Sequence, residues 1–316
     1  MTKPLDSGAI DQLARQIFET MAQVPGTRAG HRIVHAKGLV CSGTFTPSRE
    51  AATLSRAAHF TGEVPVTIRF SDGAPDPFIP DNSAFAGPRG IAIRFNLPGG
   101  KTSDIVAMSH NGFVVGTGEE FLALQKAILA TDPTKPHPWP IEQFLGGHPL
   151  ALKFVQENAI VPASLATEAF FSNDSFVFVN KSGARQVIRY QILPAAGLKH
   201  LNEDEAKAKS PDYLMQDLRE RLAKGPIQYR LVAQLPNAGD PTHDPSLVWP
   251  EDRKKVDLGL IKIASVVPDN GAAERALAFF PTNLVEGIEL SDDPFPDLRS
   301  RVYLLASNHR QNKVNG

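Results

Sequence analysis

Hydrophobic residues near the start of the chain recur at intervals of three and four positions. They are Ile10, Leu13, Ile17, Phe18 and Met21. This spacing gives a helix one apolar face, and Pro25 with Gly26 ends the pattern. It predicts an amphipathic helix over about residues 7–24 that packs against a larger body.

From residue 32 to residue 95 the pattern changes to short β-branched runs interrupted by glycine and proline, which is typical of strands and tight turns. The clearest alternation has an apolar set and a polar set. The apolar set is Val64, Val66, Ile68 and Phe70. Thr67, Arg69 and Ser71 lie between and after them. Because successive side chains of a strand point to opposite faces, we expect Arg69 and Ser71 to share one environment.

Further strands follow at the spacing of a meander. They are expected at 91–95, 105–106, 176–179, 187–191, 227–232 and 256–260. The strands 176–179 and 187–191 would form a hairpin. The strand 256–260 should have a bulge or an end near Leu260, because the apolar positions then change face. A turn at 96–100 separates the strands 91–95 and 105–106.

Helical patterns are fewer than strand patterns. Thr117 and Glu120 have the form of a capping box and open one helix, and residues 203–222 have helical spacing and charge. The proline-rich stretch 131–140 is predicted to be an irregular connection inside one domain, after which the strand pattern resumes. A last helix is expected over about 297–310.

Many short strands with a few helices predict an α+β fold built on a closed antiparallel β-barrel, with helices packed outside it. We expect a single domain over residues 1–316, with the barrel core over about 30–265. A chain of 316 residues with 42% hydrophobic and 21% charged residues can bury the core that such a domain needs.

Charge and composition exclude several classes of partner. The formal net charge is −1 and basic runs are absent from the sequence, so neither a nucleic acid nor an anionic membrane is expected. The start of the chain lacks the pattern of a secretory signal, and no stretch of about 18 apolar residues occurs. A cytoplasmic location is therefore expected, and a homodimer stays open.

Arg299 and Tyr303 are four residues apart in the last predicted helix, and Arg310 follows seven residues later. One helical face can present all three side chains. A phenol, whose unperturbed pKa is about 10, can ligate ferric iron only as phenolate, and an arginine one turn away stabilises that anion. A surface stacking pair of arginine and tyrosine is the alternative explanation.

Several motifs in order along the chain resemble the haem catalase family, and in particular its short branch, the catalase-related peroxidases. These motifs are Arg32 to Gly38 (RIVHAKG), Val66 to Ser71 (VTIRFS), Gly87 to Phe95 (GPRGIAIRF), Asp104 to Val106 (DIV) and Arg299 to Tyr303 (RSRVY). The resemblance extends from about Arg32 to Arg310. It implies the catalase barrel, peroxide chemistry and a haem b cofactor. The single cysteine, Cys41, and the absence of a Cys-x-x-Cys-His motif indicate that this haem would be held without a covalent bond.

The resemblance implies a role for each matching residue. Tyr303 would be the iron ligand with Arg299 as its partner, because catalases bind the haem iron through a tyrosine. His35 would be the catalytic histidine that moves a proton on the peroxide, oriented by Ser71. The remaining haem contacts would be made by Arg32, Arg69 and Arg310 with the propionates, and by Val34, Phe113 and Phe121 with the ring. A buried structural histidine, ordinary ion pairs and core packing are the alternative explanations.

One position departs from the family pattern. Counted from Asp104, Met108 stands where catalases carry a distal asparagine, and a thioether cannot donate a hydrogen bond to peroxide. The chain also ends soon after Arg310, without the C-terminal regions of full-length catalases, so we expect a haem edge that is open to organic reductants. Both departures favour a peroxidase that reduces hydrogen peroxide or organic hydroperoxides with small organic electron donors.

Three alternatives remain at this point. The first is a true catalase that disproportionates hydrogen peroxide. The second is a non-catalytic barrel that binds haem or another apolar ligand and does not need His35. The third, the allene oxide synthase branch of this fold, is disfavoured because Val34 stands where its members carry threonine.

Overall fold

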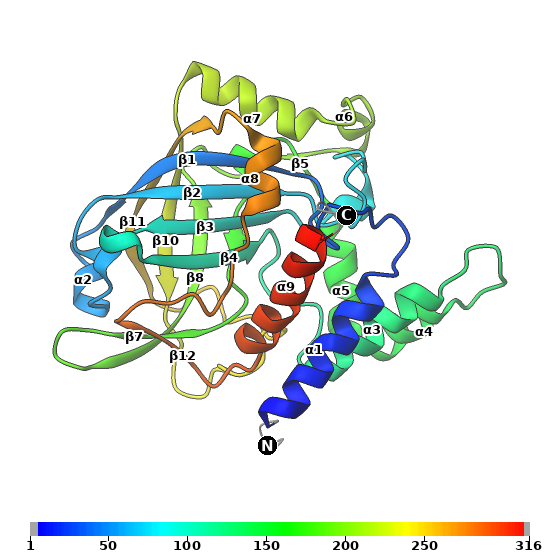
Figure 1. Cartoon of the computed structure of the whole chain (residues 1–316), viewed down its shortest axis with the longest axis horizontal. Coiled ribbons are helices and arrows are strands. Elements are labelled where there is room, and N and C mark those ends of the chain that lie inside the picture. The colour runs from blue at the N-terminus through cyan, green and yellow to red at the C-terminus, as the bar shows by residue number, and fades with distance from the viewer. Residues whose placement is uncertain (1–5, 313–316) are drawn as a thin grey trace.

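A computed structural model describes residues 6–312, and its centre is a closed antiparallel barrel (Figure 1). Eight strands follow one another around the barrel, and β8 closes the circle by pairing with β10. In spatial order they are β10 (Ile227–Gln234), β11 (Lys255–Val266), β1 (Gly38–Pro47), β2 (Val64–Ser71), β3 (Gly90–Asn96), β4 (Thr102–Met108), β6 (Phe170–Phe171) and β8 (Arg185–Pro194). The predicted α+β barrel fold is confirmed.

Aromatic side chains fill the barrel interior. The rings of Phe45 and Phe95 meet edge to face with centroids 5.2 Å apart, and Phe70 lies 5.9 Å from Phe170. Such contacts add to the free energy gained by burying the rings. The interior is therefore a packed core, which leaves the outer face of the barrel wall for a site.

Strand register determines which side chains face outward. Phe70 lies in the interior core with its cross-strand neighbours Leu39 and Ile91. The next row along these strands, Ser71 with Gly38 and Gly90, therefore faces outward, because side chains alternate along a strand. Arg69, two residues before Ser71, faces the same way.

Smaller elements extend the barrel. Two strands, β7 (Phe176–Val179) and β12 (Ile288–Leu290), continue the sheet beyond β8, and β5 (Val161–Pro162) pairs with β9 (His200–Leu201). Short helical turns join the strands at α2 (Ala51–Leu54), η1 (Ala58–Phe60), η2 (Ala84–Ala86), η3 (Pro98–Gly100) and η4 (Leu165–Thr167). The predicted hairpin is confirmed, since β7 pairs directly with β8.

Three helices pack together beside the barrel. They are α1 (Ser7–Met21), α3 (Gly118–Ala130) and α9 (Phe295–Asn312), and α1 and α9 run side by side in Figure 1. An apolar cluster joins them, with Leu13 and Ile17 from α1, Leu122 from α3, and Leu298 and Val302 from α9. This cluster fixes where α9 lies relative to the barrel wall.

The other helices lie around this assembly. They are α4 (Pro140–Gly147), α5 (Pro149–Asn158), α6 (Glu203–Lys207), α7 (Tyr213–Lys224) and α8 (Asn270–Ala276). Within residues 6–312 no helix combines the length and the apolar character needed to cross a bilayer. The single domain, the cytoplasmic location and the homodimer stay predictions.

Most expected elements are present with shifted ends. The first helix stops at Met21, the capping box of Thr117 and Glu120 is formed, and the strand near Leu260 continues to Val266 with a bulge at Leu258. Pro211 lies between α6 and α7, so the predicted helix 203–222 is two helices. Strands resume after the proline-rich stretch as expected, but α4 and α5 come first, and neither helix was predicted. Each is short and begins with proline, which leaves little room for a helical pattern.

Candidate active site

His35 lies in a loop just before β1, on the outer face of the barrel wall. Its backbone has φ 53°, a left-handed conformation that costs free energy for a residue with a side chain. Three contacts hold it there. The His35 amide donates to the Gly73 carbonyl (3.3 Å), Nη2 of Arg69 donates to the His35 carbonyl (2.8 Å), and the ring Nδ1 lies 3.0 Å from Oγ of Ser71.

Gly90 makes room for the pair of His35 and Ser71. A Cβ atom at Gly90 would lie 2.9 Å from Nδ1 of His35 and 2.7 Å from Oγ of Ser71. Any side chain at this position would therefore push the pair apart. Met108 pairs with Gly90 on the next strand, so its side chain lies in the same outward-facing row as Ser71. Asn111 lies beyond the end of β4 and outside this row.

The electrostatic environment keeps the imidazole of His35 neutral. Burial lowers its pKa to about 3, and the positive charges of Arg69, Arg299 and Arg32 act in the same direction. Neutral imidazole can accept a proton, which the protonated ring cannot. When Nδ1 donates its hydrogen to Ser71, the free Nε2 is the nitrogen that can act as a base.

Tyr303 and Arg299 lie on α9, and Asp174 supports the arginine from the loop before β7. Nε of Arg299 donates to the Tyr303 hydroxyl at 3.0 Å, and Nη1 forms an ion pair with Asp174 at 2.5 Å. Burial would lower the pKa of Arg299, but Asp174 and Tyr303 outweigh it and raise the pKa above its ordinary value. The phenol oxygen therefore has a permanent cation beside it.

Apolar side chains connect the loop of His35 with α9. Val34, Phe121 and Tyr303 pack against the same cluster that joins α1, α3 and α9. The ring of Phe113 lies 5.4 Å from Phe121 and 5.1 Å from Phe295. The structure thus brings Val34, Phe113 and Phe121 into one apolar region together with Tyr303.

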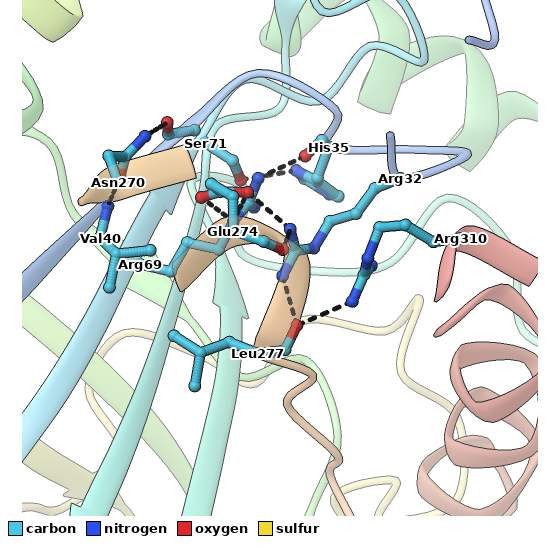
Figure 2. Close-up of polar contacts among 10 residues, drawn as sticks. Arg32, His35, Val40, Arg69, Ser71, Asn270, Glu274, Leu277 and Arg310 are labelled. Atoms are coloured by element: carbon cyan, nitrogen blue, oxygen red, sulfur yellow. Dashed lines mark hydrogen bonds and ion pairs between the residues drawn. The ribbon is translucent and has the colours of Figure 1, made fainter. Parts of the chain in front are cut away.

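The three remaining predicted arginines converge beside this region (Figure 2). Nη1 of Arg32 lies 2.5 Å from Glu274, and Nε of Arg69 lies 2.7 Å from the same carboxylate. Arg310 of α9 and Arg32 both donate to the Leu277 carbonyl, at 2.9 and 2.8 Å. Arg310 is only 3% exposed, and its Nε has no hydrogen-bond partner among residues 6–312.

Sequence reasoning missed four residues of the site. Glu274 and Asp174 are the carboxylate partners of the arginines, and Gly38 and Gly90 supply the space that the site needs. A Cβ at Gly38 would lie 2.3 Å from Nη2 of Arg69. Both glycines stand in motifs quoted above, RIVHAKG and GPRGIAIRF, but the close approach that each permits depends on a residue of another segment. Glu274 stands 205 positions from Arg69, and no local pattern connects them.

Comparison with known proteins agrees with this architecture. A family model described as "Catalase" matches residues 8–315. A "Catalase-related peroxidase" of Mycolicibacterium paratuberculosis is 34% identical and covers 91% of both chains. A second protein of that name, from Synechococcus elongatus, is 31% identical over 93% of this chain and 88% of its own. "Catalase isozyme 2" of Cucurbita pepo is 26% identical over 93% of this chain and 63% of its own length.

The chain belongs to the catalase family. The family match covers nearly the whole sequence, and two relatives exceed 30% identity over about nine tenths of both chains. The resemblance drawn from the motifs is thereby confirmed. The roles of individual residues stay predictions.

Replacing Gly90 with Ala tests whether the histidine pair depends on the missing side chain. The added methyl should push His35 and Ser71 beyond hydrogen-bond distance, about 3.5 Å. A crystal structure of Gly90→Ala measures this distance. Gly62→Ala adds the same methyl where nothing lies within 4 Å, and it should leave the pair intact. If His35 and Ser71 stay bonded in Gly90→Ala, the close approach does not set their geometry.

Proposed function

We propose that the protein is a haem-dependent peroxidase that reduces hydrogen peroxide or organic hydroperoxides with small organic electron donors. One observation carries this proposal. His35 is hydrogen-bonded to Ser71 and follows Val34, which packs in the same apolar cluster as Tyr303, and the Tyr303 hydroxyl accepts from Arg299. The two relatives above 30% identity, both named catalase-related peroxidase, support the same function.

The residues of the site fit a non-covalently held haem b. Arg32 and Arg69 contact the Glu274 carboxylate, and Arg310 shares the Leu277 carbonyl with Arg32. Three positive charges and one negative charge leave two positive charges for two propionates. The unpartnered Nε of Arg310 is a further donor that an anion could satisfy. Burial raises the pKa of the Cys41 thiol to about 12, so this residue is unsuited to be a thiolate ligand.

Each residue then has a place around the cofactor. Tyr303 would ligate the iron as phenolate, with Arg299 stabilising the negative oxygen. Arg32, Arg69 and Arg310 would bind the propionates through charge-assisted hydrogen bonds. The faces of the ring would be contacted by Val34, Phe113 and Phe121. When bound, the haem accepts electrons from the donor and passes them to the peroxide oxygen.

His35 supplies the proton movement that cleavage of the peroxide bond requires. Nε2 would take the proton from one peroxide oxygen and deliver it to the other, which leaves as water or as an alcohol. Ser71 and Arg69 hold the ring and the backbone in place for both transfers. Over the whole reaction the donor would supply two electrons and two protons, so that hydrogen peroxide gives two molecules of water and an organic hydroperoxide gives water and an alcohol.

Met108 favours donor oxidation over the catalase reaction. Catalase turnover needs a second hydrogen peroxide molecule to be oriented in the same space, and a hydrogen-bond donor assists that step. Met108 lies in the row of Ser71, buried to 8% exposure, and its thioether offers no hydrogen. Loss of one preorganised donor slows a step by roughly two to three powers of ten.

Oxygen release and donor oxidation, measured on one haem-loaded sample, test the function directly. We expect strong oxidation of a small phenolic donor and weak oxygen release, with Met108→Asn raising oxygen release by at least about tenfold. Met108→Leu, which also lacks a donor, is the matched control and should leave the ratio unchanged. Vigorous oxygen release with little donor oxidation would identify the unaltered protein as a true catalase. Haem binding without either reaction would instead support the non-catalytic barrel.

Replacing Tyr303 with Phe tests iron ligation. The substitution removes the only phenol oxygen bonded to Arg299 among the described residues, so the ferric tyrosinate absorption should disappear and haem content should fall. Absorption spectra of purified, haem-loaded protein measure both effects. Tyr190→Phe removes the same atom from the barrel core and serves as the control. An unchanged spectrum in Tyr303→Phe would exclude this ligand.

A further inference from the structure

Glu274 is held rigidly beside the three arginines by the short helix α8. Asn270, in the first turn of this helix, accepts from the Val40 amide (2.8 Å) and donates to the Gly38 carbonyl (3.3 Å), which ties α8 to β1. One turn later, Glu274 points at the arginines, as Figure 2 shows. Its side chain is 17% exposed, so water screens it weakly.

The carboxylate contacts two arginines at once. Nε of Arg69 lies 2.7 and 3.0 Å from its two oxygens, and Nη1 of Arg32 lies 2.5 Å from one of them. The carbonyls at the end of α8 carry partial negative charge and also face Arg32. The Glu274 and Leu277 carbonyls accept from Arg32 at 3.0 and 2.8 Å. Arg310 donates to the same Leu277 carbonyl at 2.9 Å.

The arginines repel one another without this carboxylate. Burial lowers the pKa of Arg32, and the charges of Arg69 and Arg310 lower it further, whereas Glu274 raises it. Arg310 shows the same pattern, with burial first, then Arg69, and Glu274 opposing both. Among the groups that act on these two arginines, Glu274 is therefore the one that offsets the repulsion.

We propose that Glu274 is a built-in counter-ion that stabilises the haem-free protein and, by repelling the propionates, weakens haem binding. This inference rests on the proposed function, because the repulsion requires propionates at the three arginines. Without haem, one carboxylate faces three guanidiniums. With haem bound, it also faces two propionates, and the total charge of the cluster becomes zero.

Thermodynamic linkage gives the two effects opposite signs. Removing the charge of Glu274 leaves three mutually repelling guanidiniums in the haem-free protein, whose stability should fall. The same change removes the repulsion between Glu274 and the propionates, so haem should bind more tightly. A residue that merely supports the pocket would lose stability and affinity together.

Glu274→Gln keeps the shape of the side chain and one acceptor oxygen, and it removes the charge. The dissociation constants of haem and of haem dimethyl ester, whose propionates are neutral, are measured with the haem-free full chain. We expect the variant to bind haem on the order of fivefold more tightly while the ester is unaffected. The midpoint of thermal unfolding without ligand should fall by about 5 °C or more.

Glu289→Gln is the matched control. It removes the same charge from an exposed ion pair with Arg185 on β8, and it should change neither the preference for haem over the ester nor the unfolding midpoint. Glu274→Asp retains the charge and should keep the original preference. If Glu274→Gln folds only when haem is supplied, the counter-ion role is supported, because the propionates then supply the negative charge that the variant lacks.

Three outcomes would overturn the inference. They are an unchanged preference for haem over its ester in Glu274→Gln, weaker binding of both ligands, and failure to fold even with haem. Failure of the proposed function is distinguishable from these, because the unaltered protein would then bind neither ligand or show no tyrosinate absorption.

Discussion

The guanidinium of Arg69 connects the parts of the site that must act together. It is 5% exposed in the barrel wall, donates through Nη2 to the His35 carbonyl, and donates through Nε to Glu274. One group therefore secures the left-handed backbone of the histidine and the centre of the arginine cluster. A buried charge needs such partners, because burying an unpaired charge would cost several kcal/mol. Gly38 permits the arrangement, because a Cβ there would overlap the guanidinium.

The barrel and the helices position different residues of the site. Strand register places Ser71, Gly90 and Met108 in one outward row, and the packed aromatic interior keeps that row from moving. Helix α9 carries Tyr303, which packs in the apolar cluster that joins α1, α3, α9 and Val34 of the loop before β1. The loop of His35 is tied to this wall by Ser71 and Arg69, so His35 and Tyr303 are both held in place by packed elements.

Sequence patterns predicted the barrel because alternation along strands reports directly on the two faces of a sheet. The same alternation placed Arg69 and Ser71 in one environment, and the structure sets both against His35. The spacing of Arg299 and Tyr303 predicted their contact for a similar reason, since one turn of helix separates them. All these patterns are local in the chain.

The features that could not be predicted depend on distant contacts. Glu274 and Asp174 contact arginines that are more than 100 residues away in the chain, and no periodic pattern marks either carboxylate. The left-handed backbone of His35 is imposed by the neighbouring loop and by Arg69, so its own sequence gives no sign of it. The depressed pKa of His35 likewise arises from burial and from arginines on other elements.

The central claim is that His35 is a neutral base held in place for proton transfer. The pH dependence of the second-order rate constant for hydrogen peroxide with the haem-loaded protein tests it most directly. With the pKa of His35 lowered to about 3, the imidazole stays neutral above that pH, so the rate should be constant from about pH 5 to about pH 8 and fall only towards pH 3. A rate that falls on acidification with a midpoint near about 6.5, the ordinary histidine value, would contradict the account.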